Sequence, residues 1–142
     1  MSTARWSPPG SVSSNLNNSA QIDSLATGST SAFLATYANG TNLDLYASVT
    51  VNLSSITPTT GGSITLWVLS GQGATVPDNT ASVGGGDAYT LPLTTTASAK
   101  VIVFPMIRLY PQNCYFAITN NAGVTLGTGN TVYVQSFDEA SA

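Results

Sequence analysis

The sequence predicts an all-β fold: a jelly-roll-like β-sandwich of about seven to eight antiparallel strands, preceded by an extended N-terminal arm. Three observations lead to this prediction. Apolar and polar residues alternate with period two in several segments. Turn-forming residues separate these segments at intervals of about 8 to 12 residues. No stretch of about ten residues has the apolar spacing of an amphipathic helix.

The 142 residues suffice for one domain with its own core. We assign residues 1–24 to the arm and residues 25–142 to the sandwich domain. The arm contains Pro8-Pro9-Gly10 and a Ser/Asn-rich tract, and its large apolar residues before position 22 are Trp6, Val12 and Leu16. Such a segment has too little apolar surface to offset the entropy lost on ordering. We therefore expect an arm that adds nothing to the core.

The clearest predicted strand covers residues 43–53. Its inward positions alternate with polar ones and are Leu43, Leu45, Ala47, Val49, Val51 and Leu53. Residues 31–38 precede it across Asn39-Gly40, a dipeptide that favours a hairpin turn, so we expect the two segments to pair antiparallel. The next predicted strand, 63–69, places Ile64, Leu66 and Val68 on one face.

Residues 70–88 are rich in Gly and turn residues and form a predicted long loop, which is either mobile or used in binding. Residues 89–93 form a short strand, and Pro92 within it favours a position at a sheet edge. Three further strands are predicted at 100–107, 114–119 and 131–137, with a short additional one at 124–126.

The composition excludes most catalytic chemistry. There is no His and one Cys, so Ser-His and Cys-His relays, imidazole metal sites, Cys₄ zinc sites and intrachain disulfides are excluded. Lys and Arg together number three, too few for the basic surface that nucleic acids require. We expect no enzyme activity, no cofactor, no metal and no small-molecule substrate.

Residues 1–30 contain no apolar run of seven or more residues. We therefore expect neither a signal peptide nor a membrane span, and synthesis in a cytoplasm.

Three weaker site hypotheses compete with structural interpretations. Asp78 and Asp87 in the long loop could converge for glycoside hydrolysis or calcium binding, but turn stabilisation is the favoured interpretation. Four aromatic residues could form a sugar-stacking platform: Trp67, Tyr46, Tyr89 and Tyr110. Cys114 could be a reactive thiol, although its alternation with Phe116 and Ile118 favours a buried apolar position.

The strongest functional signal is apolar surface beyond what one core needs. Both alternating faces are apolar in residues 101–107, and nearly so in residues 64–69, whereas a sandwich strand needs one apolar face. Either the arm or long loop covers the second face, or another subunit does. The predicted interface residues are Trp67, Leu69, Ile102, Phe104 and Met106.

A small Ser/Thr/Gly/Asn-rich sandwich without His, preceded by an arm, resembles the capsid decoration (cement) proteins of tailed bacteriophages. The run from Arg108 to Gly123 is similar to the strand-turn-strand ending of several phage virion proteins. The resemblance implies a jelly-roll subunit that assembles as a dimer or trimer about a capsid symmetry axis. It also implies binding to the outer surface of the major capsid protein shell, bridging of neighbouring capsomers, and location on the virion after synthesis in the host cytoplasm.

Arg5 and Trp6 are the expected anchors of the arm on the shell, because Trp and Arg dominate interface energetics; alternatively the start of the arm is disordered. The competing function is a carbohydrate- or receptor-binding module, such as a tail-fibre head or a lectin-like domain. It would place Trp67, Tyr46, Asp78 and Asp87 at a sugar site.

Overall fold

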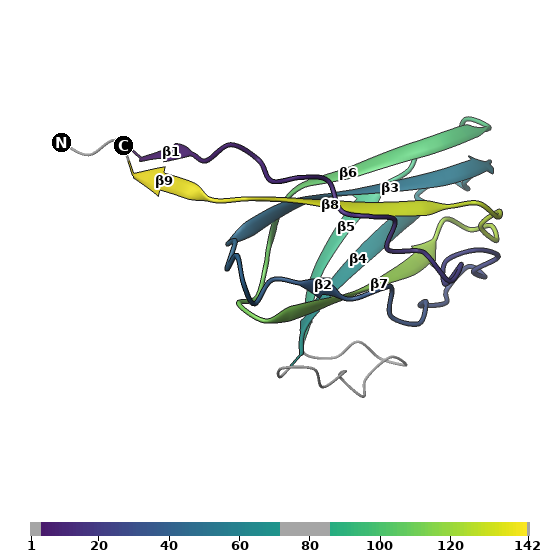
Figure 1. The fold of residues 1–142 in the computed structure, drawn as a ribbon. Helices are drawn as coiled ribbons and strands as arrows, with labels where there is room; N and C mark the ends of the chain where they lie inside the picture. Colours follow the sequence, from purple (N-terminus) through teal and green to yellow (C-terminus); the bar gives the residue numbers. More distant parts are fainter. Residues whose placement is uncertain (1–3, 72–85, 142) are drawn as a thin grey trace.

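Two antiparallel sheets pack face to face in a computed structural model that describes residues 4–71 and 86–141 (Figure 1). One sheet has the order β2 (Tyr37–Ala38), β7 (Asn113–Asn121), β4 (Ser63–Ser70), β5 (Asp87–Pro92). The other has the order β6 (Ser98–Arg108), β3 (Tyr46–Ile56), β8 (Thr131–Phe137). The described residues include no helix. The all-β sandwich is confirmed, and its jelly-roll character stays a prediction.

The two chain ends form a separate two-stranded ribbon. β1 (Ala4–Trp6) pairs antiparallel with β9 (Glu139–Ser141), and Arg5 lies opposite Ala140. β9 follows directly on β8, so this terminal ribbon extends from the three-stranded sheet beyond the body of the sandwich (Figure 1).

The alternation of β3 places Ala47, Val49 and Val51 in the core, as predicted, with β6 on one side of the strand and β8 on the other. The strand begins at Tyr46 rather than at residue 43, and Leu43 and Leu45 are about half exposed. The Asn39 side chain explains the late start. Its carbonyl oxygen accepts from Asp44 N–H and its amide donates to Asp44 C=O, which closes a turn over these residues.

The predicted hairpin between residues 31–38 and 43–53 is wrong. Residues 30–38 instead follow β7 in the opposite sheet: Tyr37 lies opposite Cys114, Ser31 N–H donates to Ile118 C=O, and Leu34 N–H donates to Phe116 C=O. Both edges of β3 are paired, one with β6 and the other with β8, so residues 31–38 cannot pair with it. The Asn-Gly turn therefore carries the chain from one sheet to the other.

The remaining strands lie close to their predicted positions. β4 turns Ile64, Leu66 and Val68 into the core, and β5 occupies a sheet edge as Pro92 indicates. Residues 124–126 are not a strand. The Asn120 amide donates to Leu25 C=O and Val124 C=O, which ties this connection to the N-terminal part of the chain instead.

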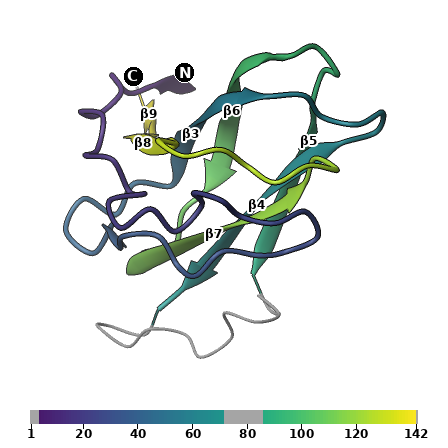
Figure 2. The same ribbon diagram turned by 90° about the vertical axis from the view of Figure 1, so that its right-hand side faces the viewer.

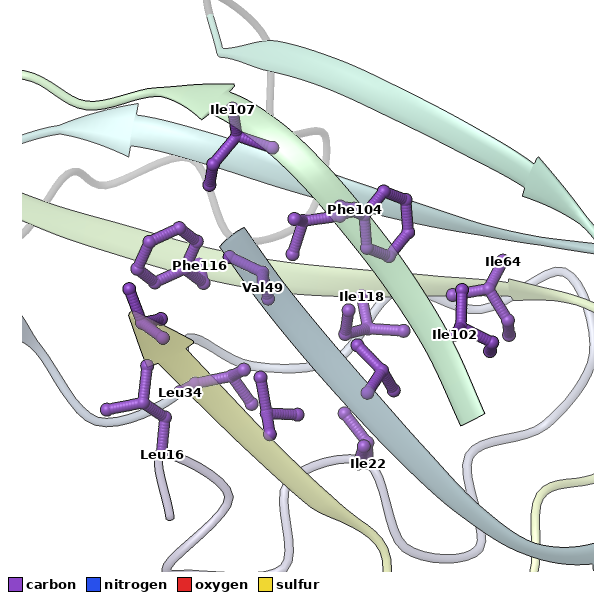
Figure 3. Close-up of a cluster of buried hydrophobic side chains, with 14 of the residues drawn as sticks. Leu16, Ile22, Leu34, Val49, Ile64, Ile102, Phe104, Ile107, Phe116 and Ile118 are labelled. Carbon is purple, nitrogen blue, oxygen red and sulfur yellow. The ribbon is translucent and has the colours of Figure 1, made fainter. Parts of the chain in front are cut away.

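The core lies between the sheets (Figure 3). Phe104 and Ile107 from β6 and Val49 from β3 pack with residues of the facing sheet, namely Phe116, Ile118 and Ile64. Leu16 and Ile22, from the segment predicted to be an arm, are also fully buried in it. The expectation that this segment adds nothing to the core is therefore wrong.

The N-terminal segment follows the outer edge of β8. The N–H groups of Ser7, Gly10, Ser13 and Leu16 donate to alternate carbonyls of 138, 136, 134 and 132. Polar side chains supply the reverse bonds, since Ser7 Oγ, Ser13 Oγ and Asn15 Oδ1 accept from the N–H groups of 138, 134 and 132. The Ser/Asn-rich composition that suggested a free arm is thus what allows these residues to complete the edge of the sheet.

Candidate functional site

The open side of the sandwich lies between the edge strands β5 and β6. A hollow of about 530 Å³ separates them, lined by residues that include Leu91, Leu93 and residues 98–103. A smaller one of about 150 Å³ adjoins it at Tyr89, Phe104 and Met106. In Figure 2 the N-terminal segment, purple to blue, lies on the side of β8 and β7 and leaves this side uncovered.

Apolar side chains on β6 point away from the core along this open side. Val101 is 69% exposed, Val103 45% and Met106 53%, whereas the alternating Ile102 and Phe104 are 6% and 2% exposed. The alternation shifts after Pro105, where β6 has one more residue than β3 between the pairs Val49–Phe104 and Ala47–Ile107. This β-bulge accommodates a proline that cannot donate to the ladder.

Lys100 is a buried cation at the end of the larger hollow. Its Nζ donates to Thr94 Oγ1 at 3.0 Å, Thr96 C=O at 2.5 Å and Ser98 Oγ at 3.1 Å. Three oxygen acceptors therefore satisfy the ammonium group without a carboxylate. The side chain holds the turn between β5 and β6 and presents no free charge to the hollow.

A third hollow, of about 380 Å³, lies where the terminal ribbon leaves the body. It is lined by Ser7, Pro9, Pro105, Met106 and Phe137. Met106 borders this hollow and the small one beside β5, so apolar surface continues from the open edge to the base of the ribbon.

The outer face of the four-stranded sheet carries a second apolar cluster that its own chain covers in part. Leu69 and Tyr115 are buried there with Phe33 and Trp67 against them, and the Phe33 and Tyr115 rings lie 5.6 Å apart. Trp67 Nε1 donates to Thr119 Oγ1 at 2.8 Å. The second face of residues 64–69 is thus apolar, as predicted, and Phe33 contributes to its cover within the subunit.

The predicted interface residues fall into three groups. Ile102 and Phe104 lie in the core and Leu69 in the second cluster, so none of them is available to a partner in this structure. Assigning Ile102 and Phe104 to the outward face of their strand was wrong, because both faces are apolar and the sequence does not distinguish them. Trp67 is half-buried and Met106 exposed.

Arg5 and Trp6 lie in β1, where the structure describes the backbone only. Val101 and Val103 are the exposed residues that the sequence analysis missed. Pro105 is the signal that could have indicated the shift of facing within the strand.

The carboxylates do not converge on one site. Asp87 accepts from Tyr110 Oη at 3.1 Å, and burial together with this bond raises the pKa of Tyr110. Asp78 lies outside the described residues. Within the described ranges no group of three or more His, Cys, Asp or Glu side chains could hold a metal ion.

The aromatic side chains do not form one platform either. Trp67 lies on the outer face of the four-stranded sheet, while Tyr46 lies on the outer face of the other sheet, stacked on Phe137 at 6.0 Å. Tyr89 and Tyr110 pack against the core from the β5 side. The four residues of the proposed sugar platform therefore belong to separate surfaces.

Cys114 lies in the core as a free thiol, on the inner face with Phe116 and Ile118. Burial raises the pKa of this thiol, although the N–H of Tyr110 partly opposes the effect by donating to the sulfur. The thiol is thus neutral and screened from solvent.

No protein-family model matches this chain, and a search of curated proteins gives no match. Over residues 4–71 and 86–141, no helix is long and apolar enough to cross a membrane.

Proposed function

We propose that this protein is a structural subunit of a virion that binds the outer surface of a capsid shell, acts as an oligomer and bridges neighbouring capsomers. The observation that carries the proposal is the exposed apolar strip on the outward face of β6, formed by Val101, Val103 and Met106. A strip of this kind on a sheet edge is typical of a protein contact rather than of a small-molecule site.

One further feature supports a role in assembly. The terminal ribbon extends from the body, and a two-stranded ribbon of three residue pairs is only marginally stable alone in water. A partner surface that received the ribbon would stabilise it. Several weak contacts of this kind become strong together when the subunits are linked, because later contacts form intramolecularly.

The partner in this proposal is the major capsid protein, and the ribbon carries Arg5 and Trp6 to it. The ribbon and the β6 strip lie at different places on the subunit, connected through Met106 at the base of the ribbon. The protein would therefore contact the shell and its own copies with separate surfaces, and would need neither a cofactor nor a substrate. The sugar-binding alternative stays a hypothesis, which a glycan array tests.

Co-sedimentation with undecorated capsids of the virus that encodes the protein tests this function. We expect the wild-type protein to sediment with the capsids and Trp6→Ala to bind on the order of tenfold or more weakly, since buried Trp anchors dominate such contacts. The matched control is Thr125→Ala, at an exposed position in the connection between β7 and β8. Absence of the wild-type protein from the capsid pellet would contradict the proposal.

A further inference from the structure

We propose that a second copy of this chain pairs antiparallel with β6 over residues 98–104, with the two-fold axis at Val101, and forms one continuous six-stranded sheet. The inference deepens the proposed function by naming the partner of the β6 strip. It rests on the geometry of the strand and requires no capsid, so it can be tested separately.

The free edge of β6 differs from the other sheet edges. β6 is 11 residues long and pairs with β3 alone, whereas β5 has six residues and ends at Pro92, and β8 is covered by the N-terminal segment. Natural proteins blunt long edges with prolines, bulges or outward charges. In β6 such features are Pro105 and the exposed Arg108, and both lie after residue 104. Over residues 98–104 the N–H and C=O groups that point away from β3 are therefore available for pairing.

The outward side chains of this stretch are complementary to themselves. Ala99, Val101 and Val103 point outward and are exposed, and none carries a charge. With the axis at Val101, this residue meets its own copy and Val103 meets the partner's Ala99. Apolar and β-branched side chains that lie directly opposite each other on neighbouring strands stabilise a sheet.

Charge and proline positions together determine the register. Lys100 lies within the paired stretch, but its ammonium group is directed inward to three oxygen acceptors. Arg108 lies beyond the pairing. Moving the axis to Val103 would place Pro105, which lacks an N–H, opposite Val101, so the axis at Val101 is favoured.

The hollow beside β5 supplies additional buried surface. Lys100 and Ile102 point inward along it, with Leu91 and Leu93 on its other wall. A second β6 strand beside the first would cover the part of this hollow that borders β6. Water would then be displaced from apolar surface on both subunits, which edge pairing alone would not achieve.

Sedimentation velocity of the full chain over a range of concentrations tests the dimer. We expect a dimer for the wild type, and for Val101→Lys a dissociation constant raised at least about tenfold, because two like charges meet on the axis. Thr125→Lys is the control and should leave the dimer intact. The circular dichroism spectrum of Val101→Lys should match the wild type, since the substituted side chain is exposed in the single subunit.

Disulfide crosslinking tests the register. Under mild oxidation Val101→Cys should crosslink to its copy, because directly opposed residues in an antiparallel pair lie within disulfide range. Val103→Cys should crosslink much less, since it faces the partner's Ala99, and the native Cys114 is buried.

A wild-type protein that stays monomeric would overturn the inference, and so would a dimer unaffected by Val101→Lys or equal crosslinking at both positions. Pairing of β6 with the terminal ribbon of another copy would appear as a larger ring or chain without crosslinking at residue 101. Capsid binding by a monomer would contradict the dimer and the oligomeric state in the proposed function, and would leave the capsid-binding part of that function intact.

Discussion

The two long sides of the sandwich differ in how the chain covers their edge strands, β8 and β6. On the β8 side the N-terminal segment pairs with the edge strand, fills the core with Leu16 and Ile22, and connects onward to the facing sheet through Ala35 N–H, which donates to Leu16 C=O. On the β6 side the described residues provide no such cover, and Val101 and Val103 are exposed. The chain therefore completes the β8 edge by itself and leaves the β6 edge apolar and open over the described residues, which is the edge that the proposed dimer would use.

The difference also shows how composition relates to burial. The covered edge uses small polar residues, whose side-chain oxygens replace ladder partners for β8. The open edge uses β-branched residues, which favour strands and would pack well against a second strand. Polar composition therefore marks the edge that the chain itself completes, and the outward apolar residues mark the edge that it leaves open.

The largest expected effect compares the two faces of β6. Phe104→Asp places a charge in the core and should destabilise the fold by at least about 4 kcal/mol or prevent folding. Val103→Asp, one residue away on the exposed face, should melt within a few degrees of the wild type at a protein concentration at which both are monomeric. Thermal melting of both variants is the measurement, and equal destabilisation would show that the outward face is also covered.

The next effect concerns the covered edge. Leu16→Ala removes a buried side chain from the segment along β8 and should cost roughly 2–4 kcal/mol in chemical denaturation. Val12→Ala, at an exposed position in the same segment, should change stability by less than about 0.5 kcal/mol. Identical midpoints for Leu16→Ala and the wild type would show that this segment does not stabilise the sandwich in solution.

A smaller, pH-dependent effect is expected at the corner where the covered edge begins. Burial alone would raise the pKa of Asp23, but hydrogen bonds from the N–H groups of Gly129 and Asn130 and from the Asn130 and Asn17 amides outweigh it, and the pKa is lowered. The carboxylate therefore stabilises the fold above its ordinary pKa of 3.8, and this contribution is lost as pH falls through the lower folded value.

Asp23→Asn should accordingly cost about 1–2 kcal/mol near neutral pH, and less as the pH falls below the ordinary pKa of 3.8. Urea denaturation of wild type and variant at several pH values measures the difference. A difference in unfolding free energy between wild type and variant that stays constant with pH would contradict the stabilising role of the Asp23 carboxylate.

The smallest effect is one of reactivity. Cys114 lies opposite Tyr37 on the covered side, and its thiol should react with an aromatic disulfide reagent only after denaturant is added. Rapid labelling of the native protein would show that Cys114 is accessible to solvent on the covered side. It would contradict the distinction between a covered edge and an open one.

The sequence alone determined the sandwich. Alternation in β3, β4 and β8 is a local property, because successive side chains of a strand point to opposite faces and an apolar set on one face requires a second sheet. The same reasoning located Cys114 in the core and β5 at an edge. In the alternating segments one face is more polar than the other, so the pattern indicates which face is buried. In β5 it is Pro92 that indicates the edge position.

Only the tertiary structure decided which strands pair and which face of β6 is buried. Strand pairing joins residues far apart in the chain through backbone groups that every residue shares, so the Asn-Gly turn could not specify that residues 31–38 follow β7 rather than β3. In β6 both faces are apolar, and alternation without contrast cannot assign inside and outside. The sequence did not indicate the place of the N-terminal segment, because it is held along β8 by backbone and Ser/Asn side-chain hydrogen bonds, which leave no apolar pattern in the sequence.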